Sequence, residues 1–355
     1  MTAVSDEPVA PETAAALLAT LVEACGTDVD GLAYDGAPVS LQGGYYAEMV
    51  RFRLADPPAE LAGDLVARIV PNPVVAAWES ALQRDVARQG FPTPKVRLVT
   101  DEHTPLGRSL LVMDHVDGRS TLSGLSGLGI VTQIPAVVRH LPDQLAALAA
   151  KLHSLDAHPV AAELEALDGG IPTTTRGFVE GELWRAAVAD RPDLVAAAEQ
   201  LIDTEPRSAR RVISHGDLHP FNVLVTADGP VLIDWTVARV AHPGFTLGFT
   251  DLMLSNPPLE VPGALAGGLR ALGRSLAARF HRTYRSLAQP ADLVSVEELD
   301  WHRQVHALRI LVELAGWDAV GARPARHPWL ILEPVALRIL GLPVSDPVDG
   351  APAGT

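Results

Sequence analysis

Alternating hydrophobic and polar positions predict β-strands in the first third of the chain. The run 48–54 alternates at a period of two, and the run 64–70 follows it after the turn-forming residues Asp56-Pro57-Pro58. A short connection of this kind favours antiparallel pairing of the two strands. Two shorter hydrophobic runs predict further strands, at 96–99 and 109–113.

Helical spacing of hydrophobic positions is found once among these strands and then dominates the chain after residue 130. It covers 74–89, where Gly90 and Pro92 end the pattern, and a stretch rich in Ala and Leu at 14–24 also favours a helix. The later helices are predicted at 143–155, 180–201, 263–287 and 296–317. The pattern therefore predicts an α+β chain with a small antiparallel sheet, one helix beside it, and a larger helical part.

Three further segments do not fit this pattern of strands and helices. Short β-like runs at 223–225 and 231–233 flank Asp228-Gly229, a dipeptide typical of hairpin turns. The segment 118–129 is rich in Gly and Ser and is a candidate boundary between the two parts. The Pro- and Gly-rich segment 341–355 is expected to be a mobile tail.

Composition narrows the classes of protein that this chain can be. With 355 residues, about two domains are expected. The 43 acidic against 28 basic residues give a net charge of −15, which disfavours nucleic acid and membrane surfaces as partners. Cys25 is the only cysteine, which excludes an internal disulfide and a cysteine-based metal site. We expect a cytoplasmic protein without a membrane span, present as a monomer or homodimer.

The densest cluster of polar residues lies around the predicted hairpin. The run 214–222 (SHGDLHPFN) precedes it and Asp234 follows it. Phosphate transfer to a hydroxyl needs one carboxylate to orient the acceptor and oxygen ligands to hold Mg²⁺. Asp217 fits the first role, and Asn222 and Asp234 fit the second.

Two other interpretations of the cluster stay open. In the first, Asp217 and Asn222 only hydrogen-bond the turn, as Asp and Asn often do. In the second, His215, Asp217 and His219 ligate zinc in a hydrolase. Gly216 and Pro220 interrupt the regular strand that would align those three side chains, which counts against the second interpretation.

The runs 215–224 (HGDLHPFNVL) and 233–235 (IDW) resemble the signature of the aminoglycoside phosphotransferase family, which also contains choline-kinase-like enzymes. The resemblance implies a two-lobed, protein-kinase-like fold and a reaction that uses ATP, or another nucleoside triphosphate, with Mg²⁺. It implies that Asp217 is the catalytic base and that Asn222 and Asp234 bind the metal. The acceptor would be a hydroxyl group of a small molecule.

The resemblance also implies a nucleotide site in the first lobe. That family has a basic residue on a strand, paired with a glutamate on the following helix. Only two of the 28 basic residues are lysines, Lys95 and Lys151, and neither lies on that strand, so Arg68 would hold the phosphates with Glu79 as its partner. The glycine-containing loop would include Gly43 and Gly44. The adenine-binding hinge would include Met113, Asp114 and Val116.

By this resemblance the chain divides into an N-lobe at 1–115, a C-lobe at 116–340 and a tail at 341–355. One position departs from the family pattern. Thr246 stands where the family usually has an Asp that fixes the catalytic loop. The resemblance therefore implies a less rigid loop unless Thr246 makes an equivalent contact. A nucleotide-binding module without activity is therefore a third alternative.

The identity of the acceptor is left open by the sequence. Acidic residues on the later helices would suit a cationic amino-sugar, and tryptophans would suit a large apolar compound such as a macrolide. The candidates are Glu180, Glu182, Glu297, Glu298, Asp300, Glu313 and Asp318, with Trp184, Trp301 and Trp317. Each of them could equally be an ordinary surface charge or a core residue.

Overall fold

The computed structural model describes residues 7–26, 31–41, 47–120, 129–167, 171–259, 261 and 263–344. The larger sheet of the described chain has the strand order β1-β3-β4-β5-β7-β6, with β2 paired to β4, and all its pairs are antiparallel. Its strands are β1 Glu7–Pro8, β2 Ala33–Tyr34, β3 Val39–Ser40, β4 Glu48–Ala55, β5 Asp64–Val70, β6 Val96–Thr100 and β7 Ser109–Asp114. The four strands predicted from the sequence, at 48–54, 64–70, 96–99 and 109–113, are therefore confirmed as β4, β5, β6 and β7.

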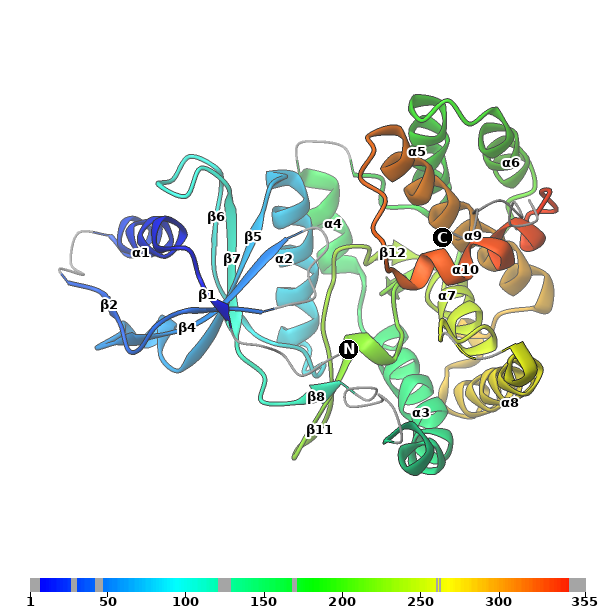
Figure 1. Ribbon diagram of the computed structural model, residues 1–355, viewed down its shortest axis with the longest axis horizontal. Coiled ribbons are helices and arrows are strands. Elements are labelled where there is room, and N and C mark those ends of the chain that lie inside the picture. Colours follow the sequence, from blue (N-terminus) through cyan, green and yellow to red (C-terminus); the bar gives the residue numbers. More distant parts are fainter. Residues whose placement is uncertain are drawn as a thin grey trace, which may run out of the picture.

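Two helices pack against the sheet, one on each face. Successive side chains of β5 point to opposite faces and so contact different helices. Leu65, Ala67 and Ile69 of β5 lie in one cluster with Leu17 and Leu21 of α1 (Pro11–Cys25). The alternate residues of a strand point to the opposite face. On that face is α2 (Pro73–Arg88), which lies between the sheet and the helical part of the molecule (Figure 1). Arg68 therefore points toward α2.

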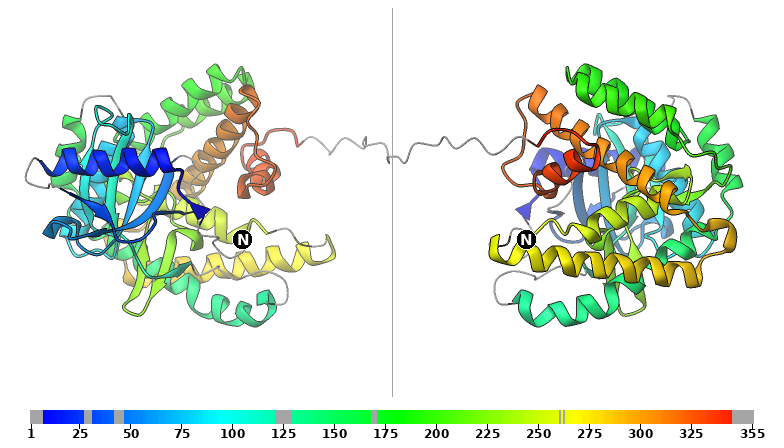
Figure 2. Two further views of the ribbon diagram at one scale, coloured as in Figure 1. Left: turned by 60° about the vertical axis from the view of Figure 1, so that its left-hand side comes forward. Right: turned by 90° about the vertical axis from the view of Figure 1, so that its right-hand side faces the viewer.

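The second part of the chain is mainly helical and contains most of two clusters of buried hydrophobic side chains. One of these clusters also includes Trp78 and Leu82 of α2, which joins the two parts. Helix α3 packs against α8, and the two run side by side in Figure 2. The helices are α3 Gly129–His153, α4 His158–Ala166, α5 Thr175–Val188, α6 Pro192–Asp203, α7 Gly244–Ser255, α8 Gly263–Leu287, α9 Val296–Ala319 and α10 Pro328–Ile339. Within the described residues, no helix is long and apolar enough to cross a membrane.

Two small sheets lie where the two parts meet. The predicted hairpin is present as β10 (Val223–Thr226) and β11 (Gly229–Leu232). Strand β8 (Arg119–Ser120) pairs with the other edge of β10. Strands β9 (Val212–Ser214) and β12 (Arg239–Ala241) form the second sheet. Trp78 of α2 donates from Nε1 to the carbonyl of Ala238 at 2.7 Å, which connects α2 directly to the second part. The predicted α+β arrangement, a small antiparallel sheet beside a larger helical part, is confirmed.

Several predicted helix bounds were wrong, for identifiable reasons. The helix predicted at 180–201 is two helices, because Asp190 has a positive φ of 54° and Pro192 starts α6. The helix predicted to start at 143 begins at Gly129. Helix α7 was not predicted at all, since it is buried on every side from Gly244 to Leu254 and has no polar face to create a period.

Buried histidines predict that acid destabilises the protein. Burial lowers the pKa of His153 to about 3, of His215 to about 4 and of His302 to about 3. In the unfolded chain each has a pKa of about 6.5, so below that pH the unfolded state binds more protons. Each histidine then lowers the free energy of unfolding at pH 5 by about 2 kcal/mol.

Glu79 acts in the opposite direction, because burial raises its pKa to about 7 and Arg68 offsets only part of that rise. Between pH 7.5 and pH 5, the stability that Glu79 adds is about equal to the stability that one histidine removes. The net loss is about 4 kcal/mol, so we expect the melting temperature of this 355-residue chain to fall by about 5 °C between pH 7.5 and pH 5 in differential scanning calorimetry. Substitution of His153 by Gln should reduce this fall, whereas substitution of the exposed His103 should not. An unchanged melting temperature over this range would contradict the prediction.

Candidate functional site

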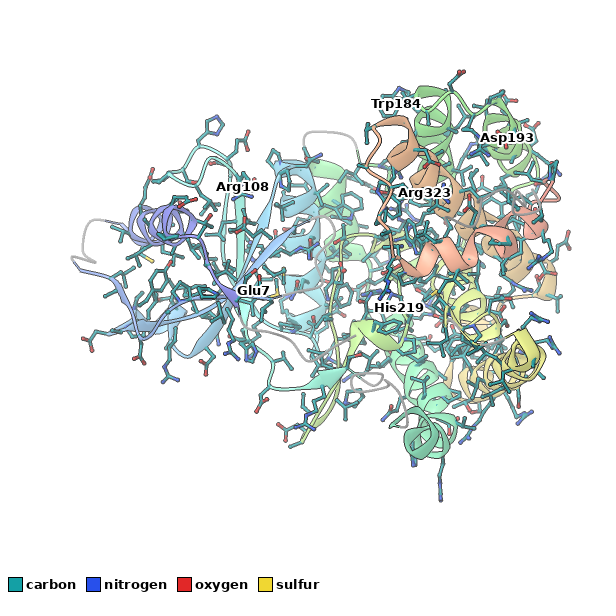
Figure 3. The ribbon with its side chains drawn as sticks, in the orientation of Figure 1. Glu7, Arg108, Trp184, Asp193, His219 and Arg323 are labelled. Atoms are coloured by element: carbon teal, nitrogen blue, oxygen red, sulfur yellow. The ribbon has the colours of Figure 1, made fainter. Side chains whose placement is uncertain are left out.

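The loop 215–222 brings the polar cluster to the junction of the two parts. It follows β9 and ends in the short 3-10 helix Pro220–Asn222. Gly216 has φ of 70°, and a Cβ added there would lie 2.3 Å from a ring carbon of Phe245. Only glycine fits both the backbone and the space at this bend. Figure 3 shows His219 of this loop between the sheet and the helices.

Helix α7 fixes the loop from behind. Thr246 Oγ1 accepts the backbone N–H of His215 at 2.9 Å, and Thr250 Oγ1 donates to the carbonyl of Leu218 at 2.8 Å. Both threonines are completely buried. Thr246 and Thr250 therefore each fix one backbone group of the loop.

Asp217 receives hydrogen bonds from three side chains. Arg309 Nη1 donates to Oδ1 at 3.0 Å, and Asn222 Nδ2 donates to Oδ2 at 2.9 Å. His219 accepts the N–H of Phe221 on Nδ1, so its Nε2 carries the proton and faces Oδ2 at 3.3 Å. Burial alone would raise the pKa of Asp217, but Arg309 and His219 outweigh it and hold the pKa well below its usual range.

Asn222 and Asp234 present oxygen atoms near Asp217. The Nδ2 of Asn222 donates to both the carbonyl and the carboxylate of Asp217, which fixes the amide orientation and leaves Oδ1 for another group. The carbonyl of Asn222 accepts the N–H of Ile233 at 3.0 Å, which places Asp234 next to it. Asp234 has a positive φ of 65°, and its side chain is 40% exposed. A strained backbone at an exposed carboxylate is typical of functional sites.

Arg68 connects the sheet to this loop. Its Nε lies 3.1 Å from Glu79 Oε2, and the pair is buried. Its Nη2 donates to Thr236 Oγ1 at 2.7 Å and lies 3.8 Å from Asp234 Oδ1. Thr236 Oγ1 in turn donates to Asp234 Oδ1 at 2.7 Å. The structure thus brings Arg68, Glu79 and Asp234 together, with Thr236 as a bridge that sequence reasoning missed.

The predicted hinge residues lie at the end of β7, where the chain leaves the sheet. Gln83 of α2 donates to Met113 Sδ at 3.7 Å and to the carbonyl of Pro94 at 2.8 Å. The side chain of Asp114 accepts from Arg97 Nε at 2.6 Å, and Val116 follows two residues later. The other two predicted nucleotide-binding residues, Gly43 and Gly44, lie outside the described residues.

His215, Asp217 and His219 do not converge on one point as zinc ligands would. His215 is completely buried, its Nδ1 accepts the N–H of Asp217, and its Nε2 donates to the carbonyl of Ile233. Both nitrogens are therefore committed to the backbone. Across the described part of the chain, no group of three His, Cys, Asp or Glu side chains is arranged to hold a metal.

Most of the acidic candidates for an acceptor pocket are already paired with arginine. Arg185 lies 3.2 Å from Glu182 Oε2 and also binds Glu313, both of which are buried. Glu180, Asp300 and Asp318 pair with Arg176, Arg303 and Arg323 at 3.2, 3.0 and 2.6 Å. Glu298 caps α9 through Ser295. These carboxylates therefore already have partners in the protein, and Glu182 and Glu313 join two helices, α5 and α9, through Arg185.

The three tryptophan candidates lie in different surroundings. Trp301 is buried and donates from Nε1 to the carbonyl of Leu201, so it belongs to the core. Trp317 stacks on Trp329 with ring centroids 6.0 Å apart. Trp184 is 66% exposed on α5 and points outward in Figure 3. None of the three is in contact with Asp217.

Arg309 of α9 is the main site residue that sequence reasoning missed. It lies 92 positions after Asp217, in a helix without a local motif. Its guanidinium carbon lies 5.2 Å from the Phe249 ring centroid and 5.1 Å from that of Trp329. Only the tertiary structure, through the packing of α9 on α7, brings it to the loop.

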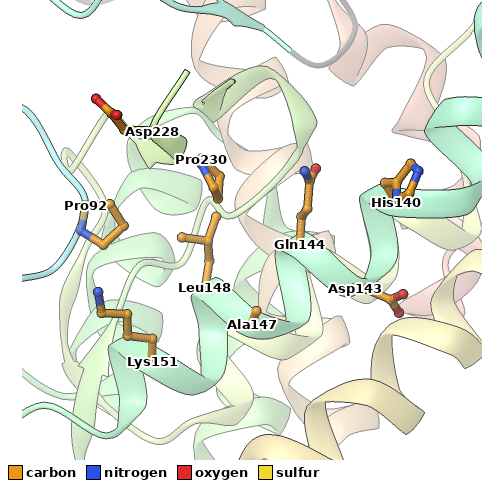
Figure 4. Close-up of a pocket in the computed structure, with 9 residues that line it drawn as sticks. All are labelled: Pro92, His140, Asp143, Gln144, Ala147, Leu148, Lys151, Asp228 and Pro230. Carbon is orange, nitrogen blue, oxygen red and sulfur yellow. The ribbon is translucent and has the colours of Figure 1, made fainter. Parts of the chain in front are cut away.

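A separate depression of about 550 Å³ lies away from these residues (Figure 4). Leu148 and Lys151 of α3, Pro92 and the hairpin residues Asp228 and Pro230 form much of its lining. Lys151 donates to the carbonyl of Gly90 at 2.9 Å. None of the predicted catalytic, metal or nucleotide residues lines this depression.

The fold is similar to that of several solved phosphotransferases. A Ralstonia eutropha protein assigned to the aminoglycoside phosphotransferases matches with a TM-score of 0.61 and 18% identity, over 92% of this chain and 95% of its own. An amicoumacin kinase matches with a TM-score of 0.58 and 11% identity, over 85% and 87%. A type I macrolide 2′-phosphotransferase matches with 0.54 and 15%, over 90% and 99%. At these identities the similarity is one of fold.

Comparison of the sequence with models of protein families identifies the family of this chain. No curated protein matches the chain significantly. The model of the phosphotransferase enzyme family, however, matches residues 40–288, which include β4, α2, the loop 215–222 and α7. The chain therefore belongs to the phosphotransferase enzyme family, whose members have a protein-kinase-like fold and transfer phosphate to hydroxyl groups of small molecules.

Proposed function

We propose that this chain transfers the γ-phosphate of ATP, or of another nucleoside triphosphate, to a hydroxyl group of a small molecule. The observation that carries the proposal is the connected series Glu79, Arg68, Thr236 and Asp234, which ends beside Asp217 and Asn222. A fixed cation for phosphates, oxygen ligands for a metal and a carboxylate for the acceptor are the three parts that this reaction needs.

The donor atoms at this place suit Mg²⁺. Asp234 offers a partly exposed carboxylate, and the fixed amide of Asn222 offers Oδ1. Oxygen ligands of this kind are those that Mg²⁺ takes, usually together with substrate phosphates. When bound, the metal would neutralise charge on the transferring phosphate. Arg68 would contact the phosphates from the side of the sheet, because Glu79 and Thr236 hold its guanidinium in one orientation.

Asp217 would orient the acceptor hydroxyl and accept its proton. Each carboxylate oxygen has two lone pairs, and Oδ2 already accepts from Asn222 and His219. Oδ1 accepts from Arg309 and retains one lone pair. The acceptor hydroxyl would therefore donate to Oδ1, beside Arg309, and its proton would pass to that oxygen during transfer.

The chain would divide its work between two lobes. Residues 1–115 would hold the nucleotide, with Met113, Asp114 and Val116 at the base and Gly43 and Gly44 over the phosphates. Residues 116–340 would carry the acceptor site. Solved relatives contain ADP with hygromycin B, GDP with kanamycin, and AMP-PNP with Ca²⁺, so either ATP or GTP is a reasonable donor here. An antibiotic acceptor and a cytoplasmic location are further parts of the proposal.

Thermal shift measurements test the nucleotide site directly. At a hundredfold excess over the dissociation constant, Mg-ATP should stabilise the protein by about 2.7 kcal/mol and raise its melting temperature by a few degrees. EDTA should reduce the shift, and a panel of hydroxyl-bearing antibiotics and metabolites should identify the phosphorylated acceptor. Stoichiometric zinc without any nucleotide shift would favour the hydrolase. Nucleotide binding without transfer to any acceptor would favour the inactive module.

A further inference from the structure

Within the described part of the chain, Arg309 donates hydrogen bonds from Nη1 alone. Nη1 donates to Asp217 Oδ1 at 3.0 Å and to the carbonyl of Gly216 at 3.2 Å. Among the described residues, Nε and Nη2 have no hydrogen-bond partner, and neither is fully enclosed. Arginine has five N–H donors in a planar fork. One edge of a fixed guanidinium is therefore available directly beside the proposed base.

The position of this guanidinium is fixed before any ligand binds. Arg309 is 8% exposed, and the rings of Phe249 and Trp329 flank its guanidinium at 5.2 and 5.1 Å. Contacts of this kind hold an arginine without neutralising its charge. Asp217 is the single carboxylate within 4.0 Å of it in the described chain.

A second buried arginine adds positive charge behind the loop. Arg239 is 4% exposed and pairs with Ser214 across the β9–β12 sheet. Its guanidinium donates to the carbonyls of Val237 and Pro172 and lies 5.0 Å from the Phe245 ring that covers Gly216. No carboxylate lies within 4.0 Å of it among the described residues. A buried cation whose described hydrogen bonds all go to carbonyls favours a negative charge nearby.

The surrounding carboxylates offset these arginines only in part. Glu182 interacts electrostatically with both Arg309 and Arg239, but it is buried and already pairs with Arg185. Glu182 and Glu313 share Arg185, and Asp217 is already engaged by Arg309. A cationic amino group placed beside the reacting hydroxyl would thus meet Arg309 before it met a free carboxylate. An anionic group would instead receive two parallel N–H donors from the open edge.

We propose that the acceptor carries a carboxylate or a phosphate close to its reacting hydroxyl, and that Arg309 binds this anionic group. The inference rests on the proposed function, because it takes Asp217 as the base. It replaces the cationic amino-sugar, which the net charge of the chain favours, by an anionic hydroxyl compound. Arg309 then determines specificity as well as positioning Asp217.

Sugars with one skeleton and different charges provide the test. Wild-type protein with Mg-ATP is assayed for phosphate transfer to glucuronate, glucose 6-phosphate, glucose and glucosamine, with kanamycin as a polycation. The binding of each probe is measured separately with the non-hydrolysable nucleotide AMP-PNP and Mg²⁺, by thermal shift. We expect the anionic probes to exceed glucose at least tenfold in kcat/KM or in affinity, and glucosamine and kanamycin to fall below glucose. The two anionic probes distinguish a carboxylate from a phosphate.

Variants separate recognition of the anion from general damage. Arg309→Gln should reduce the ratio of anionic to neutral kcat/KM, or of the affinities, at least tenfold, mainly by raising the KM for the anionic probe. Arg309→Lys should retain part of this preference, because it keeps the charge without the fork. Arg279→Gln is the matched control, since Arg279 also pairs with a single aspartate, Asp143 at 3.1 Å, on the opposite α3–α8 face. It should leave the ratio unchanged.

Three outcomes would overturn the proposal. They are a preference for glucosamine or kanamycin, a charge preference that Arg309→Gln leaves unchanged, and no binding of either anionic probe to the AMP-PNP complex at 50-fold higher concentration than the nucleotide. Failure of the proposed function has a different signature, because Mg-nucleotide itself would then produce no thermal shift. The two failures are therefore distinguishable in the same experiment.

Discussion

Asp217→Asn should lower phosphate transfer by about 10²–10⁴-fold, which is the usual contribution of a positioned base. The amide cannot accept the proton of the acceptor hydroxyl. It also places a donor group against Asn222, His219 and Arg309, which all donate to the native carboxylate. Residues that would contact the nucleotide are untouched, so Mg-ATP should still raise the melting temperature. Single-turnover transfer and thermal shift on the same preparation measure both effects.

A matched variant controls for the chemical change itself. Asp228→Asn makes the same substitution at an exposed position of the β10–β11 turn and should leave transfer unchanged. If Asp217→Asn turned over at the rate of the parent protein, Asp217 would not be the base. If it lost nucleotide binding as well, the effect would be one of folding.

Arg68→Met should raise the KM for ATP at least tenfold and also destabilise the protein. The substitution removes the proposed phosphate-binding cation and leaves the buried carboxyl of Glu79 without its partner. Breaking one side of a buried ion pair typically costs about 3–5 kcal/mol. Steady-state kinetics with varied ATP and urea denaturation of the same variant measure the two consequences.

The double variant Arg68→Met with Glu79→Gln separates these two roles of Arg68. Removal of the stranded carboxylate should restore much of the stability, whereas the high KM for ATP should remain. Arg53→Met, at a half-exposed position of the neighbouring strand β4, is the control for loss of an arginine from the sheet. Unaltered KM and kcat in Arg68→Met would place the phosphate-binding cation elsewhere.

Local patterns were sufficient for the four longer strands of the sheet, but not for the two-residue strands β1, β2 and β3, which are too short to show a period. Strand β5 was predicted with its observed bounds, Asp64–Val70, because its alternation and flanking turns are both local. Glu79 lies eleven positions after Arg68, across one turn and on the inner face of α2, so a family pattern could pair the two. The same holds for Asp217 and Asn222, which a single short 3-10 helix brings together.

Residues that depend on the packing of helices could not be found in this way. Arg309 reaches Asp217 only because α9 crosses α7, and nothing near Arg309 in the sequence signals that contact. Thr236 looked like an ordinary residue after the IDW run, although its hydroxyl bridges Arg68 and Asp234. The acidic residues of the later helices were also ambiguous, because a carboxylate and its arginine partner are indistinguishable from two solvated charges until the helices are placed.

The use of Arg68 instead of lysine has a consequence for chemical reactivity. Acylating reagents attack amines in their neutral form, and a guanidinium stays protonated at neutral pH. The chain has two lysines. Lys95 is exposed and lies just before β6, and Lys151 lies on α3 and donates to the carbonyl of Gly90. The proposed phosphate-binding end of the site, at Arg68, therefore contains no lysine amine. Reagents that silence kinases by acylating an active-site lysine have no target at that position in this protein.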